Sequence, residues 1–401
     1  MNQRPRNIKD AKRRRARRRR VRRIRAILCL VILFLLCLGI FFGIRGIVSK
    51  IQSSSKKEEM KTENAVSEKK EQKKASNIDT SSVKVKELVI NTKKDEKKQK
   101  AVTITISSMG DCTLGTDQNF NPATSLNAYY DMYGADYFFK NERKILEEDD
   151  LSIVNMEGTL TESTTRAEKK FAFKGAPEYA SILSGSSVEA ANLANNHSKD
   201  YGASSYDDTI ANLEEAGITT FGYENVALLE IKGVKVGLTG IYELAEHLGK
   251  KQQVKENIAA LKEAGAQLII VNFHWGIERE YTPNSIQKEL AHLAIDEGAD
   301  LVIGHHPHVL QGIENYKNKY IAYSLGNFCF GGNSNPGDKD TMIFQQTFTI
   351  TKEGVEEDDD INIIPCSLSS VSTKNDYCPT PLEGDSKEAV MKKIEKYSEG
   401  L

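Results

Sequence analysis

Five short apolar runs rich in β-branched residues constrain the fold more than any other feature of this chain. They are VTITIS at 102–107, LSIVNM at 151–156, VEAANLA at 188–194, LIIVNF at 268–273 and LVIG at 301–304. Their length and composition are typical of buried strands. Helical patterns lie between several of them, at 204–216, 252–265 and 284–298. Strands that alternate with helices predict an α/β domain.

Residues of metal-binding types follow these runs at the points where the strands are expected to end. They are Asp111, Glu157, Asn196, His274, His306 and His308. Because the carboxyl ends of strands form the ligand crevice of an open α/β sheet, side chains distant in sequence are expected to meet there. Carboxylate, amide and imidazole groups without thiolates suit Mn²⁺, Fe, Zn²⁺ or Mg²⁺. The sequence therefore predicts a metal centre, and two cations bridged by a carboxylate are its natural arrangement.

Each of these residues taken alone has an ordinary structural explanation. Asp111 fits an N-cap or turn residue, and the nearby His197 fits a surface loop. Their joint occurrence at successive strand ends is what favours a functional site. The acidic run EEDDD at 356–360 lacks the ligand spacing of a calcium loop, so we expect it to be solvated surface.

The motifs around these residues resemble those of the CapA family, which is linked to the synthesis of poly-γ-glutamate capsules. In chain order they are GDCTLG, NMEGTLT, ANNHSKDYG, FHWGIE, GHHPHVLQ and YSLGNF, across residues 104–330. One such motif is a weak signal, whereas six in the same order are a specific one. CapA proteins are similar to calcineurin-like metallophosphoesterases. The resemblance implies the fold of that superfamily, a four-layer α/β/β/α sandwich.

The resemblance also implies roles for the residues of the first half of the domain. Asp111 and Glu157 match acidic ligand positions, with Glu157 as the bridging ligand. Asn196 matches a ligand of the second metal ion. His197 matches the general acid or transition-state donor, and Asp200 is expected to orient its imidazole.

The histidines of the second half follow the same pattern, with one departure earlier in the chain. His274 matches the isolated ligand, while His306 and His308 match the final pair and leave His305 as a supporting ring. Thr113 stands where the phosphoesterase pattern has a histidine, so the first metal site is expected to lack one ligand. Weaker candidates for substrate contacts are His305, Glu278, Asn327 and Lys174.

The function that the resemblance implies is that of a divalent-metal-dependent hydrolase of phosphoesterase type in capsule or poly-γ-glutamate biosynthesis or export. An anionic cell-surface polymer and a capsule synthesis or export complex are its expected partners. Because a two-metal mechanism needs both cations, the missing ligand leaves a non-catalytic, metal-stabilised scaffold as an alternative. A cell-wall binding module is a further alternative, which would bind purified wall independently of metal.

The N-terminal region predicts a membrane anchor. Residues 1–25 are dense in arginine, and residues 26–44 are uncharged and apolar, which as a helix spans roughly 28 Å. Positive charge before a first apolar helix predicts a cytoplasmic N-terminus and an extracytoplasmic remainder. A cleavable signal peptide is the alternative, but the run is long and no small-residue cleavage site follows it. Beside such a helix, the arginines are expected to attract anionic lipid rather than nucleic acid.

These features divide the chain into five expected parts. They are a basic cytoplasmic segment at 1–25, a transmembrane helix at 26–44, a disordered charged linker at 45–100, the CapA-like domain at 101–368 and a peripheral tail at 369–401. The linker prediction follows from a composition of Lys, Glu and Ser that is too polar to bury a core. Beyond the apolar segment, Cys366 and Cys378 are expected either to form a disulfide or to be buried free thiols.

Overall fold

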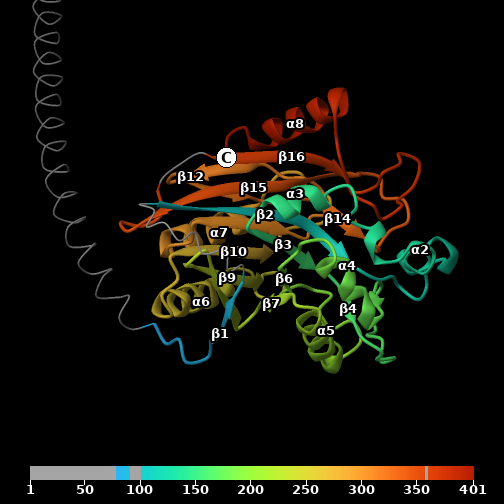
Figure 1. Cartoon of the computed structure of the whole chain (residues 1–401), viewed down its shortest axis with the longest axis horizontal. Coiled ribbons are helices and arrows are strands. Elements are labelled where there is room, and N and C mark those ends of the chain that lie inside the picture. The colour runs from blue at the N-terminus through green and yellow to red at the C-terminus, as the bar shows by residue number, and fades with distance from the viewer. Residues whose placement is uncertain (1–77, 91–100, 357–359) are drawn as a thin grey trace, which may run out of the picture. The chain divides into compact units, whose positions relative to one another are not determined.

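The computed structural model describes residues 78–90, 101–356 and 360–401, which fold around two β-sheets (Figure 1). The predicted cytoplasmic segment, the predicted transmembrane helix and much of the predicted linker lie outside the described residues. Among the described residues, no helix combines the length and the apolar composition that crossing a bilayer requires.

The first sheet has seven strands in the order β1-β8-β9-β10-β11-β13-β12. Their bounds are β1 Lys84–Val89, β8 Asn225–Ile231, β9 Val234–Tyr242, β10 Leu268–His274, β11 Leu301–His305, β13 Lys319–Ala322 and β12 Ile313–Tyr316. The strands β9, β10, β11 and β13 run parallel to one another. All seven residues of β10 are buried, as expected for a central parallel strand that is covered on both faces.

The second sheet has eight strands, seven of them in the order β17-β16-β15-β2-β3-β6-β7, and β14 pairs with β2. Their bounds are β17 Thr380–Pro381, β16 Ile361–Ser367, β15 Asp340–Thr351, β2 Ala101–Thr113, β3 Leu151–Met156, β6 Ala190–Asn192, β7 Thr219–Phe221 and β14 Asn327–Phe330. The strands β2, β3, β6 and β7 are parallel, whereas β15 is antiparallel to β2. A separate short pair consists of β4 Thr159–Leu160 and β5 Lys174–Gly175.

The layers follow the order helix, sheet, sheet, helix, and they are defined by three apolar clusters. The inner cluster joins the facing sides of the two sheets, including Ile106 of β2 and Ile270 of β10. The helices α6 Lys251–Glu263 and α7 Ser285–Glu297 pack on the outer face of the first sheet. The outer face of the second sheet is covered by α2 Leu126–Tyr133, α3 Arg143–Glu148, α4 Ala180–Ser184 and α5 Ala203–Glu215. The prediction of an α/β domain is therefore confirmed.

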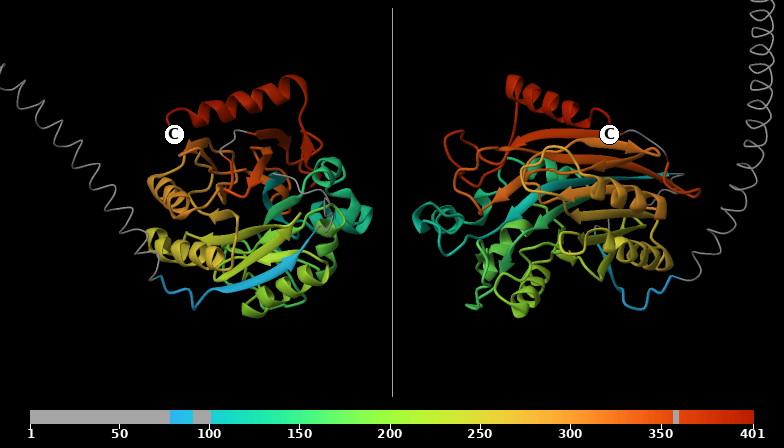
Figure 2. Two further views of the ribbon diagram at one scale, coloured as in Figure 1. Left: turned by 60° about the vertical axis from the view of Figure 1, so that its left-hand side comes forward. Right: turned by 180° about the vertical axis from the view of Figure 1, so that it is seen from behind.

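The folded region extends further toward both ends than the sequence predicts. The sequence pattern places residues 84–89 in the linker, but they form β1, which pairs in parallel with β8 at the edge of the first sheet. The predicted peripheral tail contains α8 Gly384–Ser398, which is red in Figure 2 and lies over β12 and β16. Its Val390 and Ile394 are buried in the inner cluster. The N-terminal boundary moves because β1 pairs with β8, although none of its residues is buried, and the C-terminal boundary moves because α8 buries Val390 and Ile394.

The four cysteines of the described residues are all buried and free. They are Cys112, Cys329, Cys366 and Cys378. The disulfide between Cys366 and Cys378 is therefore not formed in this structure, and the alternative of buried free thiols holds. Burial raises the pKa of Cys378 to about 12, so this thiol stays protonated and unreactive at neutral pH.

Glu142 is a fully buried carboxyl group on the N-terminal side of α3, and neither of its oxygens has a hydrogen-bond partner among the described residues. Burial raises its pKa from 4.5 to about 9. The unfolded chain therefore loses this proton at lower pH than the folded chain, and stability falls as the pH rises between these values. At pH 7 the loss is about 3 kcal/mol.

We therefore expect Glu142→Gln to unfold at a higher urea concentration than the wild type at pH 7 and 8. At pH 4 the two should differ little, because the carboxyl group is then protonated in both states. Urea denaturation followed by circular dichroism across this pH range measures the difference. If the difference in urea midpoint between Glu142→Gln and the wild type does not increase with pH, the raised pKa of Glu142 is contradicted.

Candidate metal centre

The predicted ligands meet where the carboxyl ends of strands from both sheets approach each other. Asp111 lies near the end of β2 and Glu157 follows β3, both in the second sheet. His274 and His305 are the last residues of β10 and β11 in the first sheet. The backbone N–H of His306 donates to Asp111 Oδ2 at 3.2 Å and so links the two sheets at this point.

The backbone before Asp111 requires a glycine. A Cβ at Gly110 would lie 2.1 Å from the carbonyl oxygen of Gly326. The same carbonyl accepts a hydrogen bond from the Asp111 N–H at 2.9 Å. The close approach explains the Gly-Asp pair of the first motif, because any larger residue would displace the strand that carries the carboxylate.

Glu157 is the least satisfied polar group of the centre. Its side chain is fully buried, and neither carboxylate oxygen has a hydrogen-bond partner among the described residues. Three imidazole Nε2 atoms surround Oε1, at 3.6 Å from His274 and at 3.8 Å from both His197 and His308. These distances are too long for hydrogen bonds. Ligands about 2.1 Å from a shared ion would lie on the order of 3.4 Å apart in a tetrahedral site, so the spacing fits a cation.

Burial and neighbouring charges shift the pKa values of the carboxyl and imidazole groups in this cluster. Burial is the main reason that the pKa of Glu157 lies well above its usual value, and the charge of Asp111 adds to it. Burial also opposes charge on His308, yet Glu157 and Asp111 raise its pKa to about 10. Burial lowers the pKa of His306 to about 3, which keeps this imidazole neutral and able to bind a metal ion. The ligand atoms of Glu157, His306 and His308 lie within 4.8 Å of one another.

Asp111 and His274 complete the buried polar cluster. Asp111 Oδ1 accepts a hydrogen bond from Asn155 Nδ2 at 2.8 Å, and its Oδ2 lies 3.2 Å from His308 Nδ1. Burial acts to raise the pKa of Asp111, but contacts with His305 and His308 bring it well below its usual value. His274 Nε2 lies 2.8 Å from Asn196 Oδ1, and burial lowers the pKa of this imidazole well below its usual value. This contact is a hydrogen bond, and both the neutral imidazole and the amide oxygen are of ligand types that bind divalent ions.

Two of the histidines hold a strained backbone. His306 and His308 have φ angles of 94° and 57°, a region that residues other than glycine rarely adopt. Such strain persists only where the surrounding structure imposes it, and it clusters at functional sites. Here the strained turn places both rings beside Asp111 and Glu157.

Thr113 does not replace the missing histidine as a ligand. Its hydroxyl donates to the backbone carbonyl of Glu157 at 2.8 Å, and its side chain is buried. The residue therefore positions the Glu157 backbone. The imidazoles beside Asp111 are those of His308, with Nδ1 3.2 Å from Oδ2, and of His305, with Nδ1 3.5 Å from Oδ1.

His197 and Asp200 form a dyad beside the cluster, as the sequence predicted. His197 Nδ1 lies 2.7 Å from Asp200 Oδ2, while Nε2 faces Glu157. Lys169, which the sequence did not single out, donates to Asp200 Oδ1 at 2.7 Å and to the Asn196 carbonyl at 2.8 Å. Burial lowers the pKa of His197 although Asp200 opposes this effect. No pattern in the sequence marks Lys169, because it lies in a charged loop next to a second lysine.

Replacement of Lys169 would leave the buried Asp200 carboxylate with one hydrogen-bond donor fewer. We expect Lys169→Met to destabilise the metal-free protein by about 1–3 kcal/mol, the usual cost of an unsatisfied buried polar group. Urea denaturation measures the loss. Lys170→Met is the matched control, because the Lys170 ammonium is exposed and lies over the Phe171 ring at 4.8 Å. Equal stability of the two variants would argue against a stabilising contact between Lys169 and Asp200.

The four weaker candidates occupy different positions. His305 supports Asp111, with its Nδ1 3.5 Å from Oδ1, and Asn327 Oδ1 lies 2.8 Å from His308 Nδ1. Glu278 is exposed on the loop after β10, and its charge contributes to the raised pKa of Glu157. Lys174 is directed elsewhere, because its ammonium donates to the Ser163 carbonyl at 2.9 Å and lies over the Tyr201 ring. The structure thus brings Lys169, and not Lys174, to the cluster.

Two known proteins that are similar to this chain are named for capsule or PGA biosynthesis. The "Capsule biosynthesis protein CapA" of Bacillus anthracis is 30% identical over 253 residues, which cover 57% of this chain and 60% of that protein. The "PGA biosynthesis protein CapA" of Bacillus subtilis is 31% identical over 221 residues, which cover 49% of this chain and 57% of that protein. The chain therefore spans less than two thirds of the length of these relatives.

A solved structure and a family model are also similar to this chain. The structure of a hypothetical protein from Thermus thermophilus has a TM-score of 0.41 and 13% identity, and covers 65% of this chain and 98% of that protein. The family is described as bacterial capsule synthesis protein PGA_cap, and its model matches residues 105–332. That range covers more than half of the chain and carries every strand end of the candidate metal centre. The chain therefore belongs to the bacterial capsule synthesis protein family PGA_cap.

Proposed function

We propose that this chain is a divalent-metal-dependent hydrolase of phosphoesterase type in capsule or poly-γ-glutamate synthesis. The observation that carries the proposal is the Glu157 carboxylate, which is buried without a hydrogen-bond partner among the described residues and faces three imidazoles. Such a carboxylate is costly unless a cation compensates it. Membership of PGA_cap, which lies in the metallophosphoesterase-like superfamily, supports hydrolytic chemistry.

The residues that would hold the ions are those of the buried cluster. They are Asp111, Glu157, Asn196, His274, His306 and His308. Oxygen and imidazole ligands favour Mn²⁺, Fe, Zn²⁺ or Mg²⁺, and Glu157 would be the ligand that two such ions share. Bound divalent ions would polarise a phosphoryl or carbonyl oxygen and stabilise the negative charge that develops on it.

The dyad beside the cluster supplies proton transfer. Asp200 accepts the Nδ1 hydrogen of His197 and so leaves Nε2, which faces the cluster, as the position that exchanges a proton. A proton at Nε2 can pass to the leaving group of a substrate. Lys169 balances the charge of Asp200 and fixes its orientation through a 2.7 Å hydrogen bond.

The substrate class and location are part of the proposal. Relatives named for capsule biosynthesis and PGA biosynthesis support an anionic cell-surface polymer, handled within a synthesis or export complex. The arginine-rich residues 1–25 followed by the apolar residues 26–44 support a single-pass membrane anchor with the folded unit outside the cell. Membrane fractionation of the full chain and of a chain without residues 1–50 tests the anchor, which predicts that only the full chain sediments with membranes.

Metal analysis combined with a hydrolase assay tests the activity. The purified full chain should hold about two divalent ions and should hydrolyse a chromogenic phosphodiester in the presence of Mn²⁺. Bound metal without turnover of any ester or amide in a broad screen would instead support a non-catalytic scaffold. The position of Thr113 gives that alternative its structural basis, because its hydroxyl is engaged with the Glu157 backbone.

A further inference from the structure

A row of phenylalanine rings leads from the protein surface to the metal centre. The Phe171 and Phe173 rings are nearly parallel, with centroids 6.3 Å apart and an interplanar angle of 8°. The Phe173 ring lies 4.5 Å from the His197 ring, and the Phe330 ring lies 5.3 Å from the His308 ring. Phe120 contacts both Phe171 and Phe173, at 5.9 Å and 6.4 Å. The row therefore ends against two imidazoles of the centre.

Exposure changes along this row. Phe173 and Phe330 are 4% and 7% exposed, whereas Phe171 is 38% exposed. A Cβ at Gly332 would lie 2.5 Å from the Phe330 ring and 2.9 Å from the Phe173 ring, so the absence of a side chain at Gly332 makes room for both. Phe171 is thus the outer, partly exposed member of a packed row, and the Lys170 ammonium lies 4.8 Å from its ring centroid.

The backbone on both sides of Phe171 is fixed. Buried Asp117 accepts a hydrogen bond from the Ala172 N–H at 2.6 Å, and buried Asp200 accepts one from the Phe173 N–H at 2.6 Å. Arg166 pairs with Asp117 at 2.7 Å and donates to the carbonyls of Ala167, Lys169 and Lys170. An exposed aromatic ring on such an anchored loop is held in place before any ligand arrives, which lowers the entropic cost of binding.

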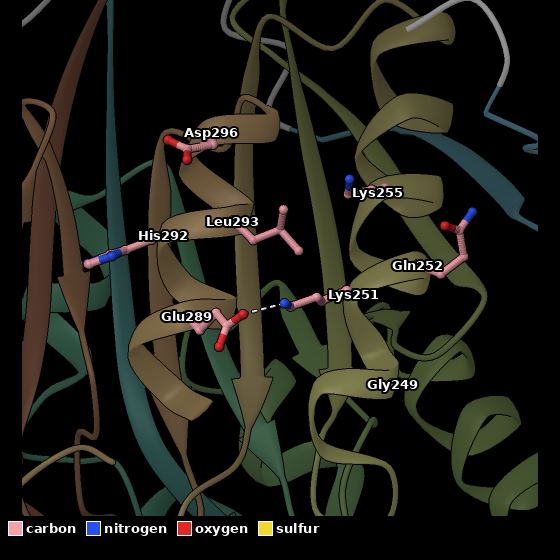
Figure 3. Close-up of a pocket in the computed structure, with 8 residues that line it drawn as sticks. All are labelled: Gly249, Lys251, Gln252, Lys255, Glu289, His292, Leu293 and Asp296. Atoms are coloured by element: carbon pink, nitrogen blue, oxygen red, sulfur yellow. Dashed lines mark hydrogen bonds and ion pairs between the residues drawn. The ribbon is translucent and has the colours of Figure 1, made fainter. Parts of the chain in front are cut away.

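The groove between α6 and α7 lacks comparable features. Its volume is about 570 Å³, and charged side chains line it (Figure 3). These charges already pair, Lys251 with Glu289, Lys255 with Glu297, and Asp296 with Lys317. No unpaired buried group points to a ligand there among the described residues, so the phenylalanine row is the stronger feature.

We propose that Phe171, with Phe173 between it and His197, forms an aromatic subsite on the approach to the metal centre, and that the substrate carries a planar or apolar group there. Because the Phe173 ring lies 4.5 Å from the ring of His197, which faces the leaving group in the proposed function, this group belongs to the leaving-group side of the substrate. The inference rests on the proposed function to the extent that the metal centre binds the anionic part of the substrate.

Two phosphonates that differ only in their organic group test the subsite by binding alone. Phenylphosphonate and methylphosphonate are titrated calorimetrically into the Mn²⁺-loaded full chain. An aromatic contact predicts a preference of about three- to tenfold for phenylphosphonate. Phe171→Ala should bring the ratio of the two affinities close to one without changing the affinity for methylphosphonate. Tyr133→Ala, which removes an aromatic ring that is 53% exposed on α2, is the matched control and should keep the preference.

The outcomes separate the two proposals. Equal binding of both phosphonates by the wild type, or a preference that survives Phe171→Ala, would overturn the aromatic subsite and leave the metal centre standing. Binding of neither phosphonate by the metal-loaded chain would overturn the anion-binding metal centre, and the subsite with it.

Discussion

Glu157→Gln should lower the affinity of the centre for divalent ions by at least about a hundredfold. Loss of an outer partner of a metal ligand already costs roughly ten- to a hundredfold in affinity, and Glu157 is placed as a ligand itself. The amide keeps the size of the side chain but loses the charge that faces His197, His274 and His308. Metal content after dialysis and calorimetric titration with Mn²⁺ measure the effect. The control is Glu278→Gln, which removes an exposed carboxylate near the centre and should retain metal.

In the metal-free protein, the same substitution should not reduce stability. Without a cation, Glu157 is a buried carboxyl group without a hydrogen-bond partner among the described residues, so its replacement by a neutral amide should leave the unfolding temperature in EDTA unchanged or raised. Added Mn²⁺ should raise the unfolding temperature of the wild type but not that of the variant. At a Mn²⁺ concentration of a hundred times the dissociation constant, the free energy of unfolding of the wild type should increase by about 2.7 kcal/mol. A variant that is destabilised in EDTA and still gains stability from Mn²⁺ would show that Glu157 is a structural group.

The proximity of the side chains of the centre could be predicted from the sequence because it follows from the order of parallel strands along the chain. Asp111, Glu157 and His274 lie at or just beyond strand ends, and the carboxyl ends of neighbouring parallel strands share one edge. Four of the five apolar runs end within two residues of the observed strand end, whereas the run at 102–107 ends six residues before the end of β2. The convergence of the six proposed ligands therefore followed from order along the chain, without knowledge of the contacts.

Contacts made by loops and late elements could not be predicted in this way. Lys169 reaches Asp200 across a loop whose path depends on the Arg166–Asp117 pair, and no periodicity records that pair. The strand β1 follows a polar segment and is defined by its pairing with β8, a partner more than a hundred residues away. In α8, Val390 and Ile394 give only a narrow apolar stripe in a charged helix. In each case the stabilising partner is distant in sequence.

His197→Gln should lower turnover by about 10²–10⁴ while the metal content stays unchanged. The expectation follows from the position of the imidazole, whose Nδ1 is held by Asp200 at 2.7 Å and whose Nε2 faces the cluster at 3.8 Å from Glu157. Glutamine preserves polarity but cannot exchange a proton near neutral pH. Steady-state kinetics on an alkyl phosphodiester, with metal analysis of the same samples, measures both properties.

Two comparisons make the His197 result specific. Asp200→Asn keeps the imidazole but weakens its orientation, so turnover should fall less than in His197→Gln. An ester whose leaving group needs no proton, such as a nitrophenyl ester, should lose less rate in His197→Gln than an alkyl ester, because the substitution removes a proton donor. Equal losses for both esters, or loss of metal together with activity, would identify His197 as a ligand of the ions. The dyad would then serve to hold the centre together, and the proton would have to reach the leaving group from another donor.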